Sequence, residues 1–394
     1  MPETGRVVVL RALTLATFAL LLIAERPAQA QTGTVVHSFT GHPDGAAPFG
    51  TLVLYGGNFY GTTQYGGSDA GNGYGTIFEL SPDGGGGWNE AVLYRFTGQW
   101  DGAYPSDVIV DNQGNLYGTT EFYGVGEYGV VFELSPGAGG WTYTVLYDFT
   151  DNGDGAYPSS GLVMDSSRNL YGGTATGGKQ GNGIVFELSP SGGVWNEQVI
   201  YDDSEANGLT MSEEGNLFCV SDKNVFELSP SGKGGWNWTF VANLAGITSN
   251  VVFDQAGHLY GATITGGSTN QGTIYELIPG KHGQWSAKTL YSFKGYPKDG
   301  AGPMGVLLDS DGNIYGSTQA GGPFIGGVGT VFELVPPVGT GKYTEKILWD
   351  FNGTDGDKPD GGLVFDAAGN LYGTTYKGGA GGHDAPGTVF EVTP

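Results

Sequence analysis

The stretch that decides the fold reads Gly114-Asn115-Leu116-Tyr117-Gly118-Thr119-Thr120 and, after a loop, Gly129-Val130-Val131-Phe132-Glu133-Leu134-Ser135-Pro136. Near-copies begin at six other positions, which are Asn58, Asn169, Asn216, His258, Asn313 and Asn370. In chain order the copies start 57, 54, 47, 42, 55 and 57 residues apart. A period of roughly 50 residues suits one four-stranded blade with long loops. The repeat therefore predicts an all-β, seven-bladed β-propeller of four-stranded antiparallel blades.

One copy shows how a blade is divided into strands. Its apolar and β-branched runs predict four strands, at Val108–Val110, Leu116–Thr120, Val130–Leu134 and Trp141–Phe149. Gly114 lies in the turn between the first two strands and tolerates a positive φ. Pro136 and the glycines after it end the third strand. Strands joined in this order form an antiparallel meander, which is one blade.

The two ends of the chain predict how the ring closes. The final segment, Gly387–Pro394, reads as a third strand with no fourth strand after it. Near the other end, Val35–Gly41 matches the fourth-strand segment Leu290–Gly295. We therefore expect the N-terminal segment to complete the last blade, which removes the free edge that an open blade would expose.

The first 30 residues have the pattern of a signal peptide. Arg6 and Arg11 flank the start of an apolar run at 12–24, and Ala28-Gln29-Ala30 supplies a cleavage pattern of small residues. We expect cleavage near Ala30/Gln31, a secreted or periplasmic protein, and a single propeller domain over 31–394 with no membrane span. An uncleaved anchor is the weaker interpretation, because the apolar run is short for a bilayer.

Composition narrows the class of partner. The formal net charge is -24, and about -25 without residues 1–30. A negative field of this size disfavours nucleic acid and anionic lipid as partners. Cys219 is the only cysteine, so no internal disulfide is possible, and the core must come from 22 Tyr, 20 Phe and 8 Trp. The 75 glycines are expected in turns and loops. We expect a monomer.

The repeat resembles a known family. Its parts are Gly-Asn-Leu-Tyr-Gly-Thr-Thr, Gly-Thr-Val-Phe-Glu-Leu-Ser-Pro, Leu-Tyr-Xaa-Phe and Asp-Gly-Ala-Xaa-Pro. Together these resemble the Gloeo/Verruco (GloVer) tandem repeat of exported bacterial proteins, over nearly all of residues 35–394. The resemblance implies an extracytoplasmic repeat protein and transfers no catalytic residue. The Asp-x-x-Gly-Asn-Leu-Tyr hairpin is also similar, at fold level, to NHL-type and lyase-type propellers.

Two sets of acidic residues recur at fixed places in the repeat. One glutamate occupies each third strand, at Glu79, Glu133, Glu187, Glu227, Glu276, Glu333 and Glu391. Because a carboxylate used once in catalysis is not needed seven times, we expect these to be scaffold that accepts hydrogen bonds; a ring of anionic sites is the alternative. One aspartate lies between the first and second strands, at Asp111, Asp165, Asp254, Asp309 and Asp366, and is expected to form an Asx-turn. Calcium at Asp309 and Asp311 is a weaker alternative, because the distal glutamate of a calcium loop is missing.

Further aspartates lie in the connections between blades, at Asp44, Asp101, Asp154, Asp299 and Asp355. In a meander these connections share one face of the ring with the loops between second and third strands. Those loops carry the aromatic residues Tyr65, Tyr123, Tyr128, Phe324 and Tyr376. This loop face is the predicted binding face, where the aspartates would hold a cation or sugar hydroxyls; the alternative is that they cap their own loops.

Blade four departs most from the repeat. Ser221-Asp222-Lys223-Asn224 replaces the long Gly-rich loop. We expect a gap in the loop face there, with Asp222 and Lys223 on its floor, that a polymer or peptide would cross. Simple decay of a surplus repeat is the alternative.

Sequence patterns for catalysis are weak. The five histidines show no metal-binding spacing, and the best metal candidate is His42 with His383 across the ring closure. No nucleophile elbow is present, and Cys219 is expected to be buried. No catalytic residue or cofactor is predicted. The first hypothesis is a non-catalytic module that binds an extracellular polysaccharide, peptide or protein. The second is a propeller hydrolase or lyase, which a carboxylate of strongly raised pKa at the channel mouth would favour.

Overall fold

A computed structural model describes residues 31–68, 73–232, 234–244, 246 and 250–394. The predicted signal peptide, residues 1–30, lies outside these described residues. Within them the only helical element is the 3-10 turn η1 (Lys281–Gly283). No helix among the described residues is long and apolar enough to cross a membrane.

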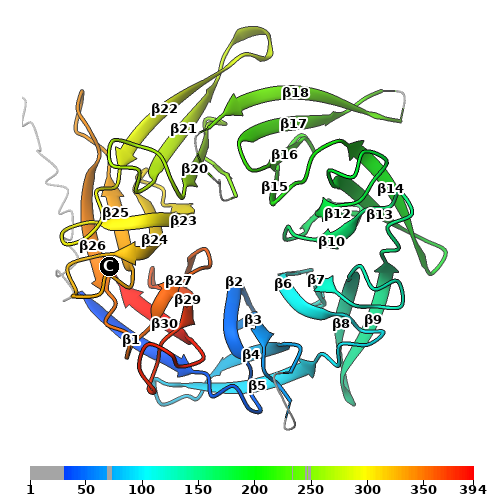
Figure 1. The fold of residues 1–394 in the computed structure, drawn as a ribbon, viewed down its shortest axis with the longest axis horizontal. Coiled ribbons are helices and arrows are strands. Elements are labelled where there is room, and N and C mark those ends of the chain that lie inside the picture. The colour runs from blue at the N-terminus through cyan, green and yellow to red at the C-terminus, as the bar shows by residue number, and fades with distance from the viewer. Residues whose placement is uncertain (1–30, 69–72, 233, 245, 247–249) are drawn as a thin grey trace, which may run out of the picture. The chain divides into compact units, whose positions relative to one another are not determined.

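Seven antiparallel sheets are arranged around a central opening, with the first strand of each sheet nearest the centre (Figure 1). Blade one consists of β2 (Ala46–Tyr55), β3 (Asn58–Tyr65), β4 (Thr76–Pro82) and β5 (Trp88–Arg95). Blade two consists of β6 (Ala103–Val110), β7 (Leu116–Phe122), β8 (Val130–Gly137) and β9 (Gly140–Asp148). Blade three consists of β10 (Ala156–Pro158), β11 (Val163–Met164), β12 (Leu170–Thr176), β13 (Ile184–Ser191) and β14 (Val194–Asp202).

Blades four to seven follow the same plan. Their strands are β15 (Gly208–Met211), β16 (Leu217–Val220), β17 (Asn224–Pro230), β18 (Trp236–Asn243); β19 (Val252–Phe253), β20 (Leu259–Thr263), β21 (Thr273–Pro279), β22 (Trp285–Ser292); β23 (Gly300–Leu308), β24 (Ile314–Gly321), β25 (Thr330–Val335), β26 (Thr344–Asp350); and β27 (Asp357–Pro359), β28 (Val364–Phe365), β29 (Leu371–Lys377), β30 (Thr388–Thr393), β1 (Thr32–Ser38). The predicted seven-bladed, all-β propeller is confirmed.

The last blade is closed by the N-terminal strand. β1 pairs antiparallel with β30, from Thr32 opposite Thr393 to Ser38 opposite Thr388. Figure 1 shows β1 lying along the outer side of the blade that contains β29 and β30. The sequence match of Val35–Gly41 with a fourth strand therefore predicted the closure correctly.

In five of the seven blades an aspartate holds the turn between the first and second strands, whereas blade four has Ser212 and blade one has Gly56-Gly57 in that turn. The Asp111 carboxylate accepts hydrogen bonds from the amides of Gln113 at 2.8 Å and Asn115 at 2.9 Å. Gly114 completes the turn at φ +84°. The equivalent amide bonds occur at Asp165, Asp254, Asp309 and Asp366. These are the predicted Asx-turns.

Within each blade, one aromatic ring of the third strand packs against the second strand at the glycine position of the Leu-Tyr-Gly motif. In blade two this ring is Phe132, which is fully buried. A Cβ atom on Gly118 would lie 2.6 Å from Phe132 Cζ and 3.0 Å from the Asp107 carbonyl oxygen. Blade four has Cys219 in the glycine's place, opposite Phe226. That thiol is buried, as expected, and burial raises its pKa.

The seven repeated glutamates accept hydrogen bonds, as a scaffold role requires. The Tyr117 hydroxyl donates to Glu133 at 2.9 Å, and the Tyr60 hydroxyl donates to Glu79 at 2.9 Å. Two glutamates also pair with lysines of the fourth strand: Lys288 with Glu276 at 3.1 Å and Lys346 with Glu333 at 2.9 Å. Glu133 and Glu79 thus tie the third strand to the second strand of the same blade, whereas Glu187 accepts a hydrogen bond from Ser189 of its own strand.

Replacing Gly118 by alanine tests the packing of the motif. The new methyl group has no room between Phe132 and the Asp107 carbonyl, so Gly118→Ala should lower the free energy of unfolding by about 1–3 kcal/mol. Urea denaturation followed by tryptophan fluorescence measures the change. Gly139→Ala is the control, because a Cβ atom there has no neighbour within 4 Å. Equal stability of the two variants would contradict this account of the glycine.

Candidate functional site

The loop face carries a continuous row of aromatic rings, here called the aromatic belt. Its members are Tyr65, Tyr74, Tyr104, Phe122, Tyr123, Tyr128 and Tyr157. The ring centroids of Tyr65 and Tyr104 are 5.2 Å apart, those of Tyr104 and Phe122 5.7 Å, and those of Phe122 and Tyr157 5.1 Å. The belt thus crosses from blade one to blade three. Three of the predicted loop-face residues, Tyr65, Tyr123 and Tyr128, belong to it.

Two belt residues are held in an unusual backbone conformation. Tyr104 and Tyr157 precede Pro105 and Pro158 in the Asp-Gly-Ala-Xaa-Pro motif, and their φ angles are +57° and +58°. A tyrosine in the left-handed region costs about 1–2 kcal/mol, and a following proline further disfavours α-type conformations. The Tyr104 amide donates to the Tyr74 carbonyl at 3.0 Å, and the Tyr157 amide to the Tyr128 carbonyl at 2.9 Å. These bonds between neighbouring blades fix both rings on the loop face.

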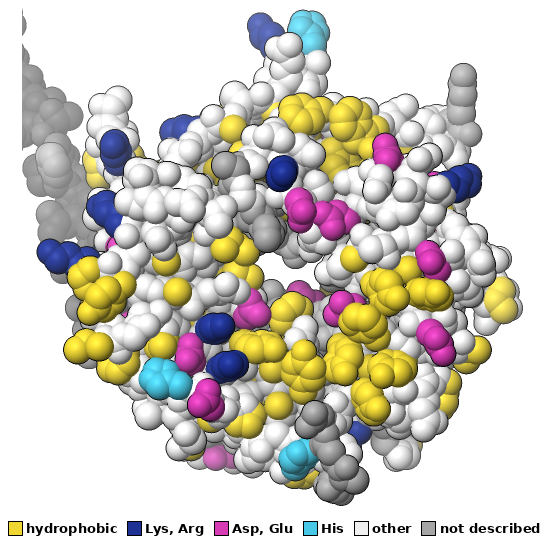
Figure 2. Space-filling view, in the orientation of Figure 1, with side chains coloured by type: hydrophobic (Ala, Val, Ile, Leu, Met, Phe, Trp, Pro, Cys, Tyr) yellow, Lys and Arg dark blue, Asp and Glu magenta, His cyan; other side chains and the backbone are white. Residues whose placement is uncertain are grey.

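The belt remains open to solvent. Tyr65 and Tyr123 are each 39% exposed, and Tyr104 and Tyr157 are half-buried. Figure 2 shows hydrophobic side chains gathered beside the central opening, in the part of the ring that holds β2 to β10. Burial, then neighbouring tyrosines and last the charge of Glu121, raises the pKa values of Tyr65 and Tyr104, and burial also raises the pKa of Glu121. The belt therefore combines ring faces, hydroxyl groups and one carboxylate.

The other predicted aromatic residues lie apart from the middle of the belt. Tyr376 extends it toward blade seven, because its hydroxyl makes a hydrogen bond with Tyr65. Phe324 instead packs against the core of blades six and seven.

The five loop aspartates cap their own connections. Asp101 is fully buried and accepts hydrogen bonds from the Thr97 amide at 2.8 Å and from the Tyr94 hydroxyl at 2.9 Å. Equivalent bonds from the preceding loop reach the other four carboxylates, which are Asp44, Asp154, Asp299 and Asp355. This is the capping role that the sequence left as the alternative. Their role in ligand binding stays a prediction.

Three blade junctions place a glutamate of the fourth strand against a loop aspartate. These pairs are Glu90 with Asp44, Glu197 with Asp154, and Glu345 with Asp299. One buried oxygen of each glutamate has no hydrogen-bond partner among the described residues. Burial, and then the nearby aspartate, raises the pKa of Glu197 to about 7 and that of Glu345 to about 8.

A second acidic feature lines the central channel. The register between Pro105 and Val108 shifts at a β-bulge, which leaves Ser106 and Asp107 out of the ladder. Asp107 lines a cavity of about 160 Å³ together with Thr51, Asn207, Asn250 and Asp360. Burial, followed by the charge of Asp360, raises the pKa of Asp107 to about 6, although the Thr51 amide donates a hydrogen bond to it. Figure 2 shows acidic side chains beside the opening.

Blade four has the short loop that its sequence predicts. β16 and β17 are joined by a turn at 221–223, in which the Ser221 amide donates to the Asn224 carbonyl at 2.9 Å. Asp222 and Lys223 are exposed, and Asp222 shares a hydrogen bond with Glu205, which raises the pKa of Glu205 after the effect of burial. The predicted gap also involves residues 245 and 247–249, which lie outside the described part of the chain.

Three of the four metal candidates, His42, His383 and Asp309, have other partners close by. His42 bonds to the Ser68 carbonyl, and His383 contacts Asp357 at 3.1 Å. Asp309 accepts hydrogen bonds from its own turn, while Asp311 is exposed. Among the described residues, no group of three or more His, Cys, Asp or Glu side chains is placed to hold a metal ion.

Sequence reasoning missed part of this face. Tyr74, Tyr104, Phe122 and Tyr157 complete the belt, and Asp107 and Asp360 line the channel. The signal for Tyr104 and Tyr157 was the variable Xaa of Asp-Gly-Ala-Xaa-Pro, which is aromatic in two copies only. The signal for Asp107 was its place two residues after the proline of the Asp-Gly-Ala-Xaa-Pro motif, because the other copies have no carboxylate at that position.

Comparison with known proteins gives one family and one fold. The sequence model of the Gloeobacter/Verrucomicrobia repeat matches residues 24–225 and 221–394. No protein of curated function matches the chain. A streptogramin B lyase structure superposes with a TM-score of 0.58 at 12% identity, covering 92% of this chain and 97% of that one. A catalytically inactive virginiamycin B lyase from Staphylococcus aureus with quinupristin gives 0.58 at 11% identity, covering 92% and 100%. At such identities the likeness shows the fold alone.

The carboxyl pairs predict how stability depends on pH. An exposed glutamic acid has a pKa of about 4.3, so a folded pKa near 8 means that the folded chain binds more protons between these values. The free energy of unfolding should therefore fall as the pH rises from 5 to 8. Glu345→Gln removes the charge and should raise the melting temperature at pH 8.5 by roughly 2 °C or more, with a smaller effect at pH 5. Scanning calorimetry measures both, with exposed Glu214→Gln as the control. An equal effect at both pH values would contradict the assignment.

Proposed function

We propose that this chain, which belongs to the Gloeobacter/Verrucomicrobia repeat family, is an exported, non-catalytic propeller that binds an extracellular polysaccharide on its loop face. The observation that carries the proposal is the aromatic belt, a row of rings held side by side across three blades. A peptide or protein partner is the other ligand class that such a face accepts.

The chemistry of the belt suits a sugar chain. Sugar rings have an apolar face of C–H groups that stacks on aromatic rings, and an edge of hydroxyl groups that needs hydrogen-bond partners. Tyr104 and Phe122 meet edge to face, and Phe122 and Tyr157 are tilted by 50°, so the belt offers both ring faces and ring edges to a sugar chain. Glu121 lies beside Tyr65 and Tyr104 as an acceptor. Because the connections between the blades hold the belt in place, little side-chain freedom is lost on binding.

Export is the second part of the proposal, and it rests on the pattern of residues 1–30. The expected mature N-terminus is Gln31. Mass spectrometry of the protein recovered outside the cytoplasm would show it, and recovery of the full-length chain inside the cell would contradict it.

The alternative, a hydrolase or lyase, is favoured by one observation. The pKa of Asp107 is raised to about 6. Asp107 lines the channel, and Asp360 is the other carboxylate among the described residues that line the same cavity. Such a group can take up and release a proton near neutral pH. Incubation of the wild type and Asp107→Asn with each bound polysaccharide, followed by assay of released reducing ends, decides between the two. Turnover by the wild type that Asp107→Asn abolishes would replace the binding proposal.

Removing two rings from the belt tests the binding proposal. Tyr65→Ala with Tyr104→Ala should weaken polysaccharide binding by about 10-fold or more, because about 1.4 kcal/mol of stacking is lost. Affinity electrophoresis in gels containing soluble polysaccharides measures this as lost retardation.

The control is an exposed aromatic residue of another blade that is not part of the aromatic belt. Phe240 is 49% exposed on the outer strand of blade four, so Phe240→Ala should leave the retardation unchanged. Melting curves verify that all variants are folded. Equal losses in the two variants, or no retardation of the wild type by any polysaccharide, would defeat the proposal.

A further inference from the structure

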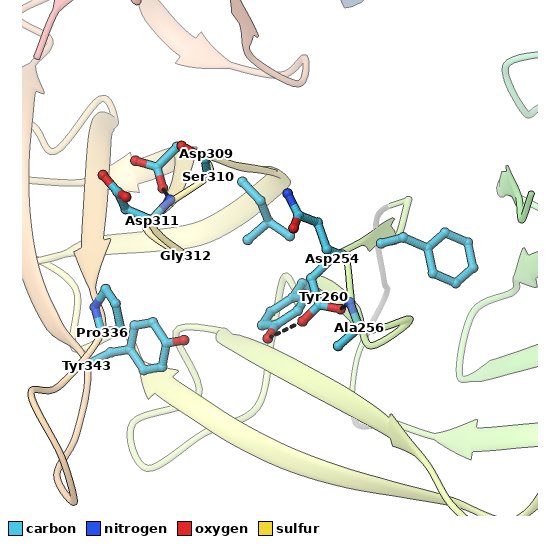
Figure 3. Close-up of a pocket in the computed structure, with 12 residues that line it drawn as sticks. Asp254, Ala256, Tyr260, Asp309, Ser310, Asp311, Gly312, Pro336 and Tyr343 are labelled. Atoms are coloured by element: carbon cyan, nitrogen blue, oxygen red, sulfur yellow. Dashed lines mark hydrogen bonds between the residues drawn. The ribbon is translucent and has the colours of Figure 1, made fainter.

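A cavity of about 570 Å³ lies between blades five and six, on the face opposite the aromatic belt. It is formed by the Asx-turns of the two blades and by the hairpin that joins β25 to β26 (Figure 3). Its volume falls within the range of about 300–1,000 Å³ that is typical of small-molecule sites. The proposed polysaccharide site does not use this cavity.

A departure from the repeat explains why the cavity occurs at this junction. In blades one to five the fourth strand begins at a tryptophan that packs on an aromatic ring of the preceding blade. The pairs are Trp88 with Tyr372, Trp141 with Tyr60, Trp195 with Tyr117, Trp236 with Tyr171, and Trp285 with Phe218. In blade six the residue before Thr344, at the tryptophan's place in the register, is Tyr343.

The smaller ring leaves space that a tryptophan would fill. At the junction of blades three and four, where Trp236 is present, the equivalent cavity measures about 300 Å³. The cavity beside Tyr343 is nearly twice as large. Figure 3 shows the Tyr343 ring at one side of the cavity and Tyr260 at the other, with the Tyr343 hydroxyl directed between them.

The lining combines apolar surface with negative charge. Phe253, Leu308 and Pro336 contribute apolar walls beside the two tyrosine rings. The carboxylates of Asp254 and Asp309 are used by their own turns, and Tyr260 donates to Asp254 at 3.2 Å. Asp311 differs, because it is exposed at the rim and no described group donates a hydrogen bond to its carboxylate. No lysine or arginine lines the cavity among the described residues.

We propose that this cavity binds a small organic cation, an ammonium or guanidinium group carried on a nonpolar body. Aromatic faces attract cations, and the carboxylates at the rim supply the opposite charge. The Tyr343 phenol remains protonated, because burial and the nearby Glu276 and Asp254 raise its pKa. The nonpolar body would lie against Leu308 and Pro336, while the charged group would meet Asp311.

Titration calorimetry with matched charged and neutral probes tests this. Acetyl-arginine amide and phenethylamine carry the cation on two different bodies, and acetyl-citrulline amide and 2-phenylethanol are their neutral counterparts. Each charged probe should bind more tightly than its counterpart, and the stronger of the two identifies the preferred body. No saturable binding of either cation up to about 10 mM, or equal binding of the neutral probes, would overturn the proposal.

Substitutions distinguish binding of a cation in the cavity from a general attraction of cations to an acidic protein. Tyr343→Trp restores the residue used in five other blades, so it should keep or raise the melting temperature while weakening binding by about 10-fold or more. Asp311→Asn should weaken binding by about 3- to 10-fold. Glu214→Gln is the matched control, because it removes an exposed charge from the same turn position in blade four. Wild-type affinity in Tyr343→Trp and Asp311→Asn, or an equal loss in Glu214→Gln, would overturn the proposal. If Tyr343→Trp does not fold, Asp311→Asn against Glu214→Gln decides.

Discussion

The ring depends on the backbone hydrogen bonds between β1 and β30. Within the other six blades the strands follow one another along the chain, but this pair joins residues that are 350 to 361 positions apart. Cys219 is the only cysteine and is buried, so no covalent bond supports the closure. Once β1 is in place, β30 no longer presents an unpaired edge, and the last blade has an outer strand like the other six. The positions of the loops on both faces follow from that closure.

Both candidate sites are built from small departures from a shared scaffold. The scaffold itself is repetitive: an Asx-turn, a buried aromatic ring against a glycine or Cys219, and a glutamate bonded to a neighbouring strand recur around the ring. The aromatic belt arises where the Xaa position is tyrosine, in two of the blades, and is held there by bonds between neighbouring blades. The cavity between blades five and six arises where Tyr343 stands in place of tryptophan. In each case one side chain changes the surface without changing the sheet beneath it.

The fold could be predicted because its determinants are local and repeated seven times. Turns like that from Asp111 to Asn115 and the alternating strands give a similar hairpin in each copy, with the aspartate present in five of them. The match of Val35–Gly41 to a fourth strand gives the closure. The site could be predicted only in part. Tyr65 and Tyr123 were found because they lie in Gly-rich loops, but Tyr104 depends on a left-handed backbone that no side-chain pattern reveals. Asp107 likewise depends on a β-bulge that turns it toward the channel. The loop aspartates instead accept hydrogen bonds from amides and hydroxyls of their own loops, as Asp101 does from the Thr97 amide and hydroxyl.

The register of the closing pair also sets how the ring responds to mechanical force. Thr32 lies opposite Thr393, so the outer ends of the two strands are at the same edge of the last blade. A pull applied at these two residues would load the hydrogen bonds between β1 and β30 one after another, as in opening a zipper, instead of all together in shear. The blade that completes the ring is therefore also the place where tension between the ends would open it first, after which the remaining blades would be peeled off in sequence.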